Sequence, residues 1–426
     1  MTQSLRARDR FLYFILLWCV FSFKILLGGV GEAGLRIDDL LILVAFLILM
    51  FRGDFRRIPR SEALRIYLIF LLINFFSAAW NAMMGRVQFL YATLFTIRLV
   101  EYLVFYYLGY ALVESGIQVW RGIKIYFYVL CVVVALQSLD LIPVVSLFNA
   151  VRASGNTNGP YELAVVAAFF LCYFGYQERQ RLSAVAAFVL MLLTASRITF
   201  VGTVMGFVWR TVTRSKAKLR VLAVALAMLL VAWGGMALFQ STPNTDEDAE
   251  SLGNRLQSSS SLFSLDEVSV LWDAVPTYRR AEDYFHGAFL DAIVFGTLSE
   301  KDPSGMVRVY RWATLVKTTV SHMDSIVIGL GPSFGSVAVD GYYVRLFAEG
   351  GLAGLLMFLF CIRALIKPQA GVSTAFREFV IIVVVTAFFI DIFTSYKTMI
   401  LLWLWHGMNE YHSSESEQGT AKVALD

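Results

Sequence analysis

Apolar runs of membrane-spanning character dominate this chain. A helix needs about 20 apolar residues to cross a bilayer, so the longer runs predict full spans and the shorter ones fall near that limit. The pattern therefore predicts an all-α polytopic membrane protein with about 12 transmembrane helices. The twelve runs lie near residues 11–29, 38–51, 66–84, 93–113, 123–142, 160–176, 183–196, 198–210, 219–240, 346–366, 378–394 and 397–410.

One long polar interruption divides this pattern after the ninth run. Within it, residues 281–298 have the pattern of an amphipathic interfacial helix, and residues 306–325 have helical periodicity. We therefore expect one large, partly helical loop outside the membrane. The expected organisation is an N-terminal transmembrane bundle of about nine spans at 1–240, the loop at 241–345, C-terminal transmembrane helices at 346–410 and a tail at 411–426.

Arginine and lysine residues mark alternate gaps of this pattern. They precede the first run and follow the second, fourth, sixth, eighth and tenth runs, so every even-numbered gap is basic. Cytoplasmic loops of membrane proteins carry such an excess of positive charge. We therefore expect both termini and the tail to be cytoplasmic, and the loop at 241–345 to lie on the outer side of the membrane.

The composition supports a membrane protein and narrows its chemistry. Of 426 residues, 58% are hydrophobic and only 16% are charged, against about 25% charged in soluble domains. The net charge of +4 arises in the short basic loops, so it indicates topology and no nucleic-acid partner. The four cysteines and four histidines show no paired metal-ligand spacing, and the chain has no Walker A, G-x-S-x-G or dinucleotide-binding motif. We expect no metal and no other cofactor.

Arginines on the outer side are the candidate binding residues. Arg152 lies beside a tight turn in VRASGNTNGPYELA, where it could bind a phosphate or serve only as an interface anchor. Arg197, in TASRITF, falls at the outer turn of a short helical hairpin, or within one irregular helix, and at this depth it needs an anion or an acidic partner. Arg308 and Arg311 are three apart, so they share a helix face and could grip one anion. The same loop also contains Arg279, Arg280 and Arg345.

Four segments follow one another in this order: RASGNTNGPYELA at 152–164, TASRITFVG at 194–202, RVYRWATLVKTTVSHMDSIVIGLGP at 308–332 and DGYYVRLFAEGGLAG at 340–354. Together they resemble the O-antigen polymerase and ligase family (the Wzy and WaaL proteins). The resemblance covers roughly residues 36–410 and includes about twelve spans with one large outer loop. The ligases carry His-Asn, then nine residues, then GxxG. Here Asp340-Gly341 stands at the His-Asn position, with Gly351 and Gly354 at the glycines, so the missing histidine favours the polymerase.

The resemblance implies a GT-C-like membrane glycosyltransferase in the bacterial inner membrane, with the large loop in the periplasm. It would transfer a glycan from undecaprenyl pyrophosphate to the terminal sugar hydroxyl of another lipid-linked repeat unit, without a cofactor. The implied partners are these undecaprenyl-pyrophosphate-linked oligosaccharides, the lipid bilayer, a chain-length regulator and a flippase. The alternatives are a ligase that transfers the glycan to lipid A core and, more remotely, a transporter or lipid-linked glycan flippase.

The resemblance also suggests roles for residues. Cleavage of a sugar–pyrophosphate bond leaves charge on the departing group, which fixed guanidinium groups can stabilise. The acceptor hydroxyl needs a base, for which Asp340 is the first candidate and Glu349 the second. Tyr342 and Tyr343 could stack on sugars or belong to an interfacial aromatic belt. The arginines expected to bind pyrophosphate are Arg152, Arg197, Arg308 and Arg311, with Arg279, Arg280 and Arg345 also available.

Overall fold

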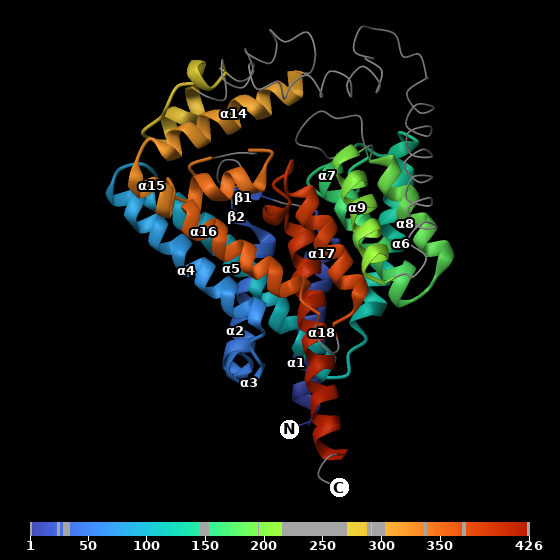
Figure 1. Ribbon diagram of the computed structural model, residues 1–426. Helices are drawn as coiled ribbons and strands as arrows, with labels where there is room; N and C mark the ends of the chain where they lie inside the picture. The colour runs from blue at the N-terminus through green and yellow to red at the C-terminus, as the bar shows by residue number, and fades with distance from the viewer. Residues whose placement is uncertain are drawn as a thin grey trace.

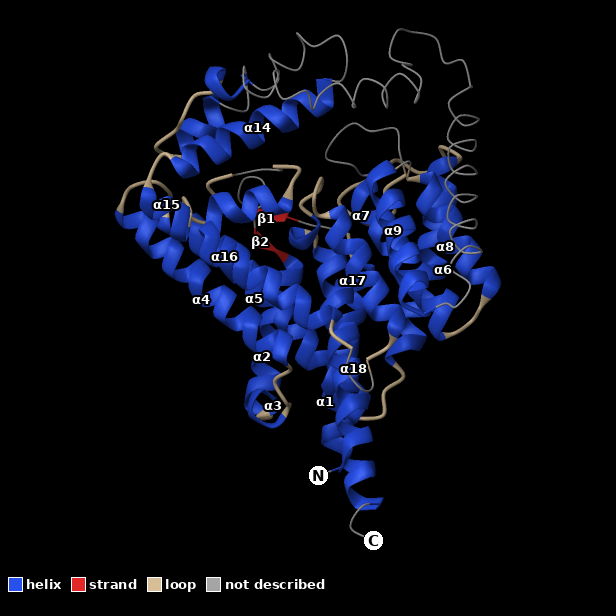
Figure 2. Ribbon diagram, in the orientation of Figure 1, coloured by secondary structure: helices blue, strands red, loops and turns tan. Residues whose placement is uncertain are grey.

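The computed structural model of the chain is helical almost throughout the residues it describes. Extended structure among them is limited to a short antiparallel ladder between β1 (Leu26–Gly28) and β2 (Leu35–Arg36). Figure 2 shows this ladder in the middle of the molecule, among the helices. The described residues are 2–23, 26–28, 35–144, 153–194, 196–214, 271–287, 291, 303–335, 339–368 and 372–423.

The helices follow the predicted apolar runs closely in the first half of the chain. In chain order they are α1 (Thr2–Phe21), α2 (Ile37–Phe51), α3 (Asp54–Arg57), α4 (Glu62–Met83), α5 (Phe89–Glu114), α6 (Val119–Ser138), α7 (Pro160–Cys172) with a π-helical turn η2 (Tyr173–Gln177), α8 (Arg181–Leu193), α9 (Arg197–Arg214), α14 (Pro303–Val320), α15 (Met323–Ile328), α16 (Tyr342–Ile366), α17 (Thr374–Thr386), a 3₁₀ turn η3 (Ile392–Thr394) and α18 (Tyr396–Val423).

Four of the described helices are long and apolar enough to cross a membrane. They are α4, α5, α6 and α16, and each carries many exposed apolar side chains, such as Leu72 on α4 and Leu90 on α5. Large exposed apolar surface on a helix is expected where lipid is the solvent. The helical fold confirms the all-α prediction, and these four helices are compatible with a membrane protein, whereas the number of twelve spans stays a prediction.

The chain ends and the outer-loop helix lie at opposite ends of the molecule. In Figure 1, α1 begins and α18 ends at the bottom, whereas α14 crosses the top above α16 and α17. Between these ends, α18 packs along α5, α16 along α4 and α17 along α9. The helix bearing Arg308 and Arg311 therefore lies across the end of the bundle that is remote from both termini.

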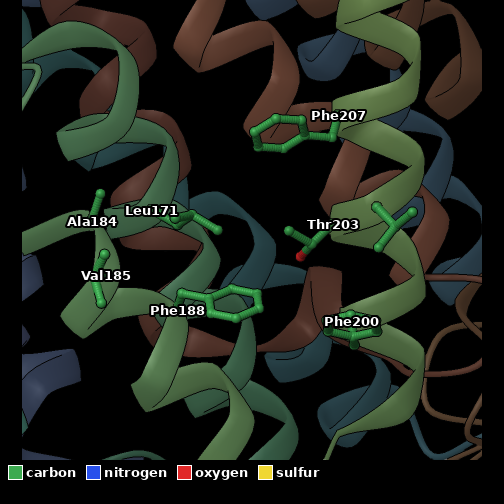
Figure 3. A pocket seen from close by; sticks show the side chains of 8 residues that line it. Leu171, Ala184, Val185, Phe188, Phe200, Thr203 and Phe207 are labelled. Carbon is green, nitrogen blue, oxygen red and sulfur yellow. The ribbon is translucent and has the colours of Figure 1, made fainter. Parts of the chain in front are cut away.

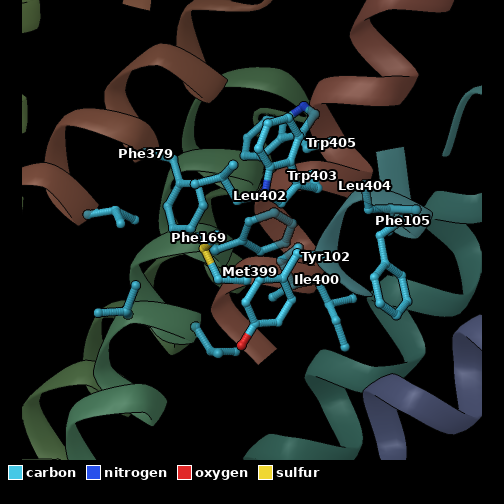
Figure 4. Close-up of a cluster of buried hydrophobic side chains, with 14 of the residues drawn as sticks. Tyr102, Phe105, Phe169, Phe379, Met399, Ile400, Leu402, Trp403, Leu404 and Trp405 are labelled. Carbon is cyan, nitrogen blue, oxygen red and sulfur yellow. The ribbon is translucent and has the colours of Figure 1, made fainter. Parts of the chain in front are cut away.

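Close helix crossings in the core depend on glycine. The aromatic cluster of Figure 4 surrounds α18, where Trp403 and Trp405 are fully buried. A Cβ atom at Gly407 would lie 2.0 Å from the carbonyl oxygen of Tyr106, and one at Gly109 would lie 2.4 Å from that of Leu404. Small residues let membrane helices approach this closely, so α5 and α18 cross backbone to backbone.

Helix α16 is broken at Gly351, where φ is +63° and ψ is −166°. The break leaves carbonyl groups of the preceding turn without their helical partners. They accept hydrogen bonds from other segments instead: the carbonyl of Ala348 from the amide of Leu330 at 2.7 Å, and that of Glu349 from the amide of Gly331 at 3.2 Å. Irregular backbone within a membrane is tolerated where such groups are satisfied by protein.

Several predicted boundaries are wrong. Helix α1 ends at Phe21, short of residue 29, and α17 ends at Thr386, short of residue 394. Helix α16 begins at Tyr342, inside the range assigned to the outer loop. Helix α18 continues to Val423, well inside the range assigned to the tail. The predicted span at 219–240 and most of the loop before Pro303 lie outside the described residues.

Candidate functional site

Arg308 and Asp340 meet where α14 crosses the start of α16. Nε of Arg308 lies 3.3 Å from Oδ2 of Asp340, although the residues are 32 positions apart in sequence. The two side chains are 24% and 33% exposed. A predicted anion-binding arginine and the predicted base thus lie together at a partly open position. Asp340 itself precedes α16, which begins at Tyr342.

Trp312 fixes this crossing of α14 over the start of α16. It follows Arg308 by four residues, on the same helix face. Its Nε1 donates a hydrogen bond to the carbonyl of Val339 at 3.1 Å. A Cβ atom at Gly341 would lie 2.7 Å from the same Nε1. Only glycine at 341 allows the indole to approach the backbone so closely, which places Arg308 against Asp340.

Burial and the neighbouring arginines act in opposite directions on the pKa of the Asp340 carboxyl. Burial raises the pKa of the Asp340 carboxyl, and the nearby Arg308 guanidinium opposes this rise. The negative charge of Asp391 raises that pKa further, whereas Arg311 lowers it. Arg311 is half-buried on α14 beside Arg308. The cluster therefore brings two guanidinium groups within the electrostatic influence of one carboxylate.

Glu349 occupies a different environment from Asp340. Its Oε1 lies 3.3 Å from Nε of Arg345 and accepts a hydrogen bond from the amide of Gly335 at 3.2 Å. The Glu349 side chain is only 6% exposed. A base must reach its substrate's proton, so this arrangement favours Asp340 over Glu349.

Arg345 lies inside the protein instead of at its surface. Its side chain is 1% exposed and its Nη1 is 3.0 Å from Oδ2 of Asp391. The guanidinium also lies over the ring of Phe95, 4.7 Å from its centroid. Arg345 is therefore paired with two carboxylates, those of Glu349 and Asp391, and the predicted pyrophosphate role would require it to leave them.

Sequence reasoning missed Asp391 as a site residue. Its carboxylate accepts hydrogen bonds from the amides of Val339 and Gly341, on either side of Asp340. The available signal was its position within the apolar stretch FFIDIF, because a carboxylate there needs a partner. The partner could not be identified from the sequence, since Arg345 belongs to another helix.

The two predicted sugar-stacking tyrosines differ in their surroundings. The ring of Tyr342 packs between those of Phe358 and Phe393, with centroids 5.1 and 5.2 Å away, and is buried. This packing disfavours stacking on a sugar. Tyr343 is half-buried, and its hydroxyl donates a hydrogen bond to the carbonyl of Val384 at 2.9 Å.

The remaining predicted arginines are either exposed or outside the described residues. Arg279 and Arg280 are exposed, just before the short helix at 281–287. Arg152 lies outside the described residues, as does the side chain of Arg197. The backbone of Arg197 begins α9 after α8 ends at Leu193, so the predicted break between two helices is confirmed.

The motif that follows Arg152 helps to hold helix ends together. Glu162 accepts hydrogen bonds from the backbone amides of Lys397 at 2.7 Å and Asn158 at 2.8 Å. Lys397 Nζ in turn donates to the carbonyls of Cys19, Val20 and Ser22, at the end of α1. Cations are favoured at helix C-termini, so this buried cluster is explained as a cap that joins α1, α7 and α18.

An apolar groove of about 210 Å³ lies between α7, α8 and α9. Figure 3 shows the rings of Phe188, Phe200 and Phe207 around it, with Thr203 also in its lining.

Within the described part of the chain, no group of three His, Cys, Asp or Glu side chains is arranged to hold a metal ion. No protein-family model and no curated protein matches the chain.

Proposed function

We propose that the chain is a membrane glycosyltransferase of the O-antigen or exopolysaccharide polymerase type. It transfers a glycan from undecaprenyl pyrophosphate to the terminal sugar hydroxyl of another lipid-linked repeat unit. The single observation that carries the proposal is the contact between Arg308 and Asp340. It pairs a phosphate-binding group with a base at a partly exposed position, at the end of the molecule remote from both termini.

In the proposed reaction, Asp340 accepts the proton of the acceptor hydroxyl as its oxygen attacks the anomeric carbon of the donor. The new glycosidic bond forms as the bond from that carbon to the pyrophosphate oxygen breaks. The electron pair of the broken bond leaves with undecaprenyl pyrophosphate. Arg308 and Arg311 stabilise this added negative charge, which a fixed guanidinium does best where water is partly excluded.

The contact of Arg308 with Asp340 leaves the arginine able to bind phosphate as well. Arg308 reaches Asp340 through Nε, and its two terminal Nη groups belong to the same planar fork, which matches phosphate oxygens. Proton transfer neutralises Asp340 as charge develops on the leaving pyrophosphate. The arginine can therefore exchange one anionic partner for another during the reaction.

The proposed setting is the bacterial inner membrane, with α14 on the periplasmic side and both termini in the cytoplasm. The alternate basic gaps support this topology. About twelve spans and a GT-C-like arrangement belong to the same proposal, with a chain-length regulator and a flippase as candidate partners.

The test uses purified protein and undecaprenyl-pyrophosphate-linked oligosaccharide, with products separated by chain length. We expect a ladder of two or more repeats on the lipid. Arg308→Ala and Arg311→Ala should each abolish the ladder, and Asp340→Asn should slow it without loss of donor binding. Lys367→Ala is the matched control, since it removes an exposed cation whose ion pair with Glu62 contributes little.

The other outcomes separate the competing functions. Transfer of the glycan to added lipid A core, without a ladder, would identify a ligase. Movement of labelled lipid-linked glycan across liposomes, without glycosyl transfer, would identify a transporter or flippase. Normal ladders from both arginine variants would exclude the pyrophosphate role of this pair.

A further inference from the structure

The backbone at Asp340 adopts a conformation that most residues with a side chain avoid. Its φ is +56°, in the left-handed region. Aspartate visits this region more readily than most residues, yet only as a single residue held by its surroundings. The direction of the Asp340 carboxylate, and hence its contact with Arg308, depends on whatever fixes the peptide groups on either side.

Asp391 fixes both of these peptide groups. Its Oδ2 accepts a hydrogen bond from the amide of Val339 at 2.9 Å, and its Oδ1 accepts one from the amide of Gly341 at 3.3 Å. The two oxygens of one carboxylate therefore bind the amides immediately before and after Asp340. A neutral amide side chain in the same place would present an NH2 donor to one of these N–H groups, because only one of its two terminal atoms is an acceptor.

Arg345 holds Asp391 in place for this task. Its Nη1 lies 3.0 Å from the same Oδ2 that binds Val339, and the Asp391 side chain is 8% exposed. A buried carboxylate persists in its charged form only when it is paired and hydrogen-bonded. The ion pair thus explains how an aspartate within an apolar stretch can serve as a backbone clamp.

We propose that Asp391 is a positioning residue for the reaction, one that turns Asp340 toward Arg308 without touching substrate itself. This inference rests on the proposed function of Asp340 as the base. Trp312 completes the arrangement from α14 by binding the carbonyl of Val339 at 3.1 Å. Asp391 thus binds the amides of Val339 and Gly341, and Trp312 binds the carbonyl of Val339.

The experiment is a double-mutant cycle with Asp340→Asn, Asp391→Asn, the double variant and the unaltered chain. Turnover and KM are measured with undecaprenyl-pyrophosphate-linked oligosaccharide. Asp391→Asn should lower kcat by about 100-fold, as a misplaced catalytic group does, and change KM less than about twofold. In the Asp340→Asn background, Asp391→Asn should lower kcat less than about twofold, because a positioning residue acts only through its target.

The outcomes separate this inference from the function it rests on. Wild-type turnover by Asp340→Asn would overturn the proposed base. An equal fold-decrease in kcat from Asp391→Asn in both backgrounds would overturn the positioning role alone. So would a change in KM with kcat unaltered.

Trp312→Phe gives an independent test if Asp391→Asn fails to fold. It keeps an aromatic ring but removes the hydrogen bond to Val339. It should show the same dependence on Asp340, and an equal loss in both backgrounds would contradict the inference. Lys367→Ala is the control, since its exposed ion pair with Glu62 lies at the other end of α16 and its loss should leave kcat unchanged.

Discussion

Arg86, in the turn between α4 and α5, makes two hydrogen bonds with Asp324 of α15. Nη1 lies 2.7 Å from Oδ2, and Nη2 lies 3.1 Å from Oδ1. The indole of Trp80 donates to the same carboxylate at 3.2 Å. Two-pronged arginine–carboxylate pairs are among the better-defined ion pairs in proteins, so this contact fastens α15, in the predicted outer loop, to the turn between α4 and α5.

Asp324→Asn should therefore loosen the outer-loop helices. We expect the free energy of unfolding to fall by about 1 kcal/mol at neutral pH, as for other partly exposed pairs. The Arg86 guanidinium lowers the pKa of Asp324 from 3.8 to about 2. A carboxyl with a lowered folded pKa stabilises above its unfolded pKa and loses that effect as pH falls. The difference between variant and wild type in thermal unfolding should thus be full at pH 7 and shrink between pH 4 and pH 2. A difference at pH 2 as large as that at pH 7 would contradict this account.

Arg345→Met should destabilise the protein strongly. It leaves the buried carboxylates of Glu349 and Asp391 without their cation, and breaking such a pair costs about 3–5 kcal/mol. Adding Glu349→Gln removes one uncompensated charge, so it should restore part of the loss. Thermal unfolding in detergent would measure both effects.

The rescued variant also separates the structural role of Arg345 from its predicted pyrophosphate role. Undecaprenyl pyrophosphate should compete with substrate as strongly in the folded double variant as in the wild type. Weaker competition would show that Arg345 binds pyrophosphate directly.

The acid limb of the pH–rate profile should report Asp340. Its pKa is raised, chiefly by burial, and a base works only when it is ionised. Activity should therefore rise with pH through a value above the ordinary 3.8 of an aspartate. Arg308→Gln removes the main charge that lowers the pKa of Asp340, so the acid limb of this variant's residual activity should move to higher pH. Asp391→Asn removes a neighbouring negative charge, so its limb should move to lower pH. Unmoved limbs in both variants would assign the titration to another group.

The sequence predicts much of the helical framework because local pattern determines it. The run at 66–84 corresponds to α4, which begins after Ser61, whose hydroxyl accepts a hydrogen bond from the amide of Leu64. The periodicity at 306–325 locates α14 within a few residues and places Arg308 and Arg311 correctly on one helix.

The pairing of distant side chains is beyond the reach of such patterns. Asp391 lies in a stretch that is apolar enough to predict a span to residue 394, yet the chain leaves the helix at Thr386 and turns beneath Val339. Only the packing of α16 against this turn brings Arg345 to Asp391, 46 residues away. A hydropathy pattern predicts which residues are buried or face lipid, but it cannot predict which buried charged residues pair with each other.

Gly351 and Gly350 offer a matched pair for testing the break in α16. A Cβ atom at Gly351 would lie 2.4 Å from the backbone carbonyl carbon of Val327, at a φ of +63°. Backbone strain and overpacking each cost about 1–3 kcal/mol, so Gly351→Ala should destabilise the protein by about 3 kcal/mol or more. At Gly350 the nearest contact would be 3.9 Å, to a side-chain atom of Leu346.

Gly350→Ala should therefore be neutral or stabilising by up to about 1 kcal/mol, because alanine favours helix over glycine. Fluorescence-detected size-exclusion chromatography and thermal unfolding in detergent would compare the two variants. The break at Gly351 lets residues 327–331 cross α16 backbone to backbone, so loss of folded protein is expected from the first substitution alone. Equal behaviour of the two variants would mean that α16 does not need this break.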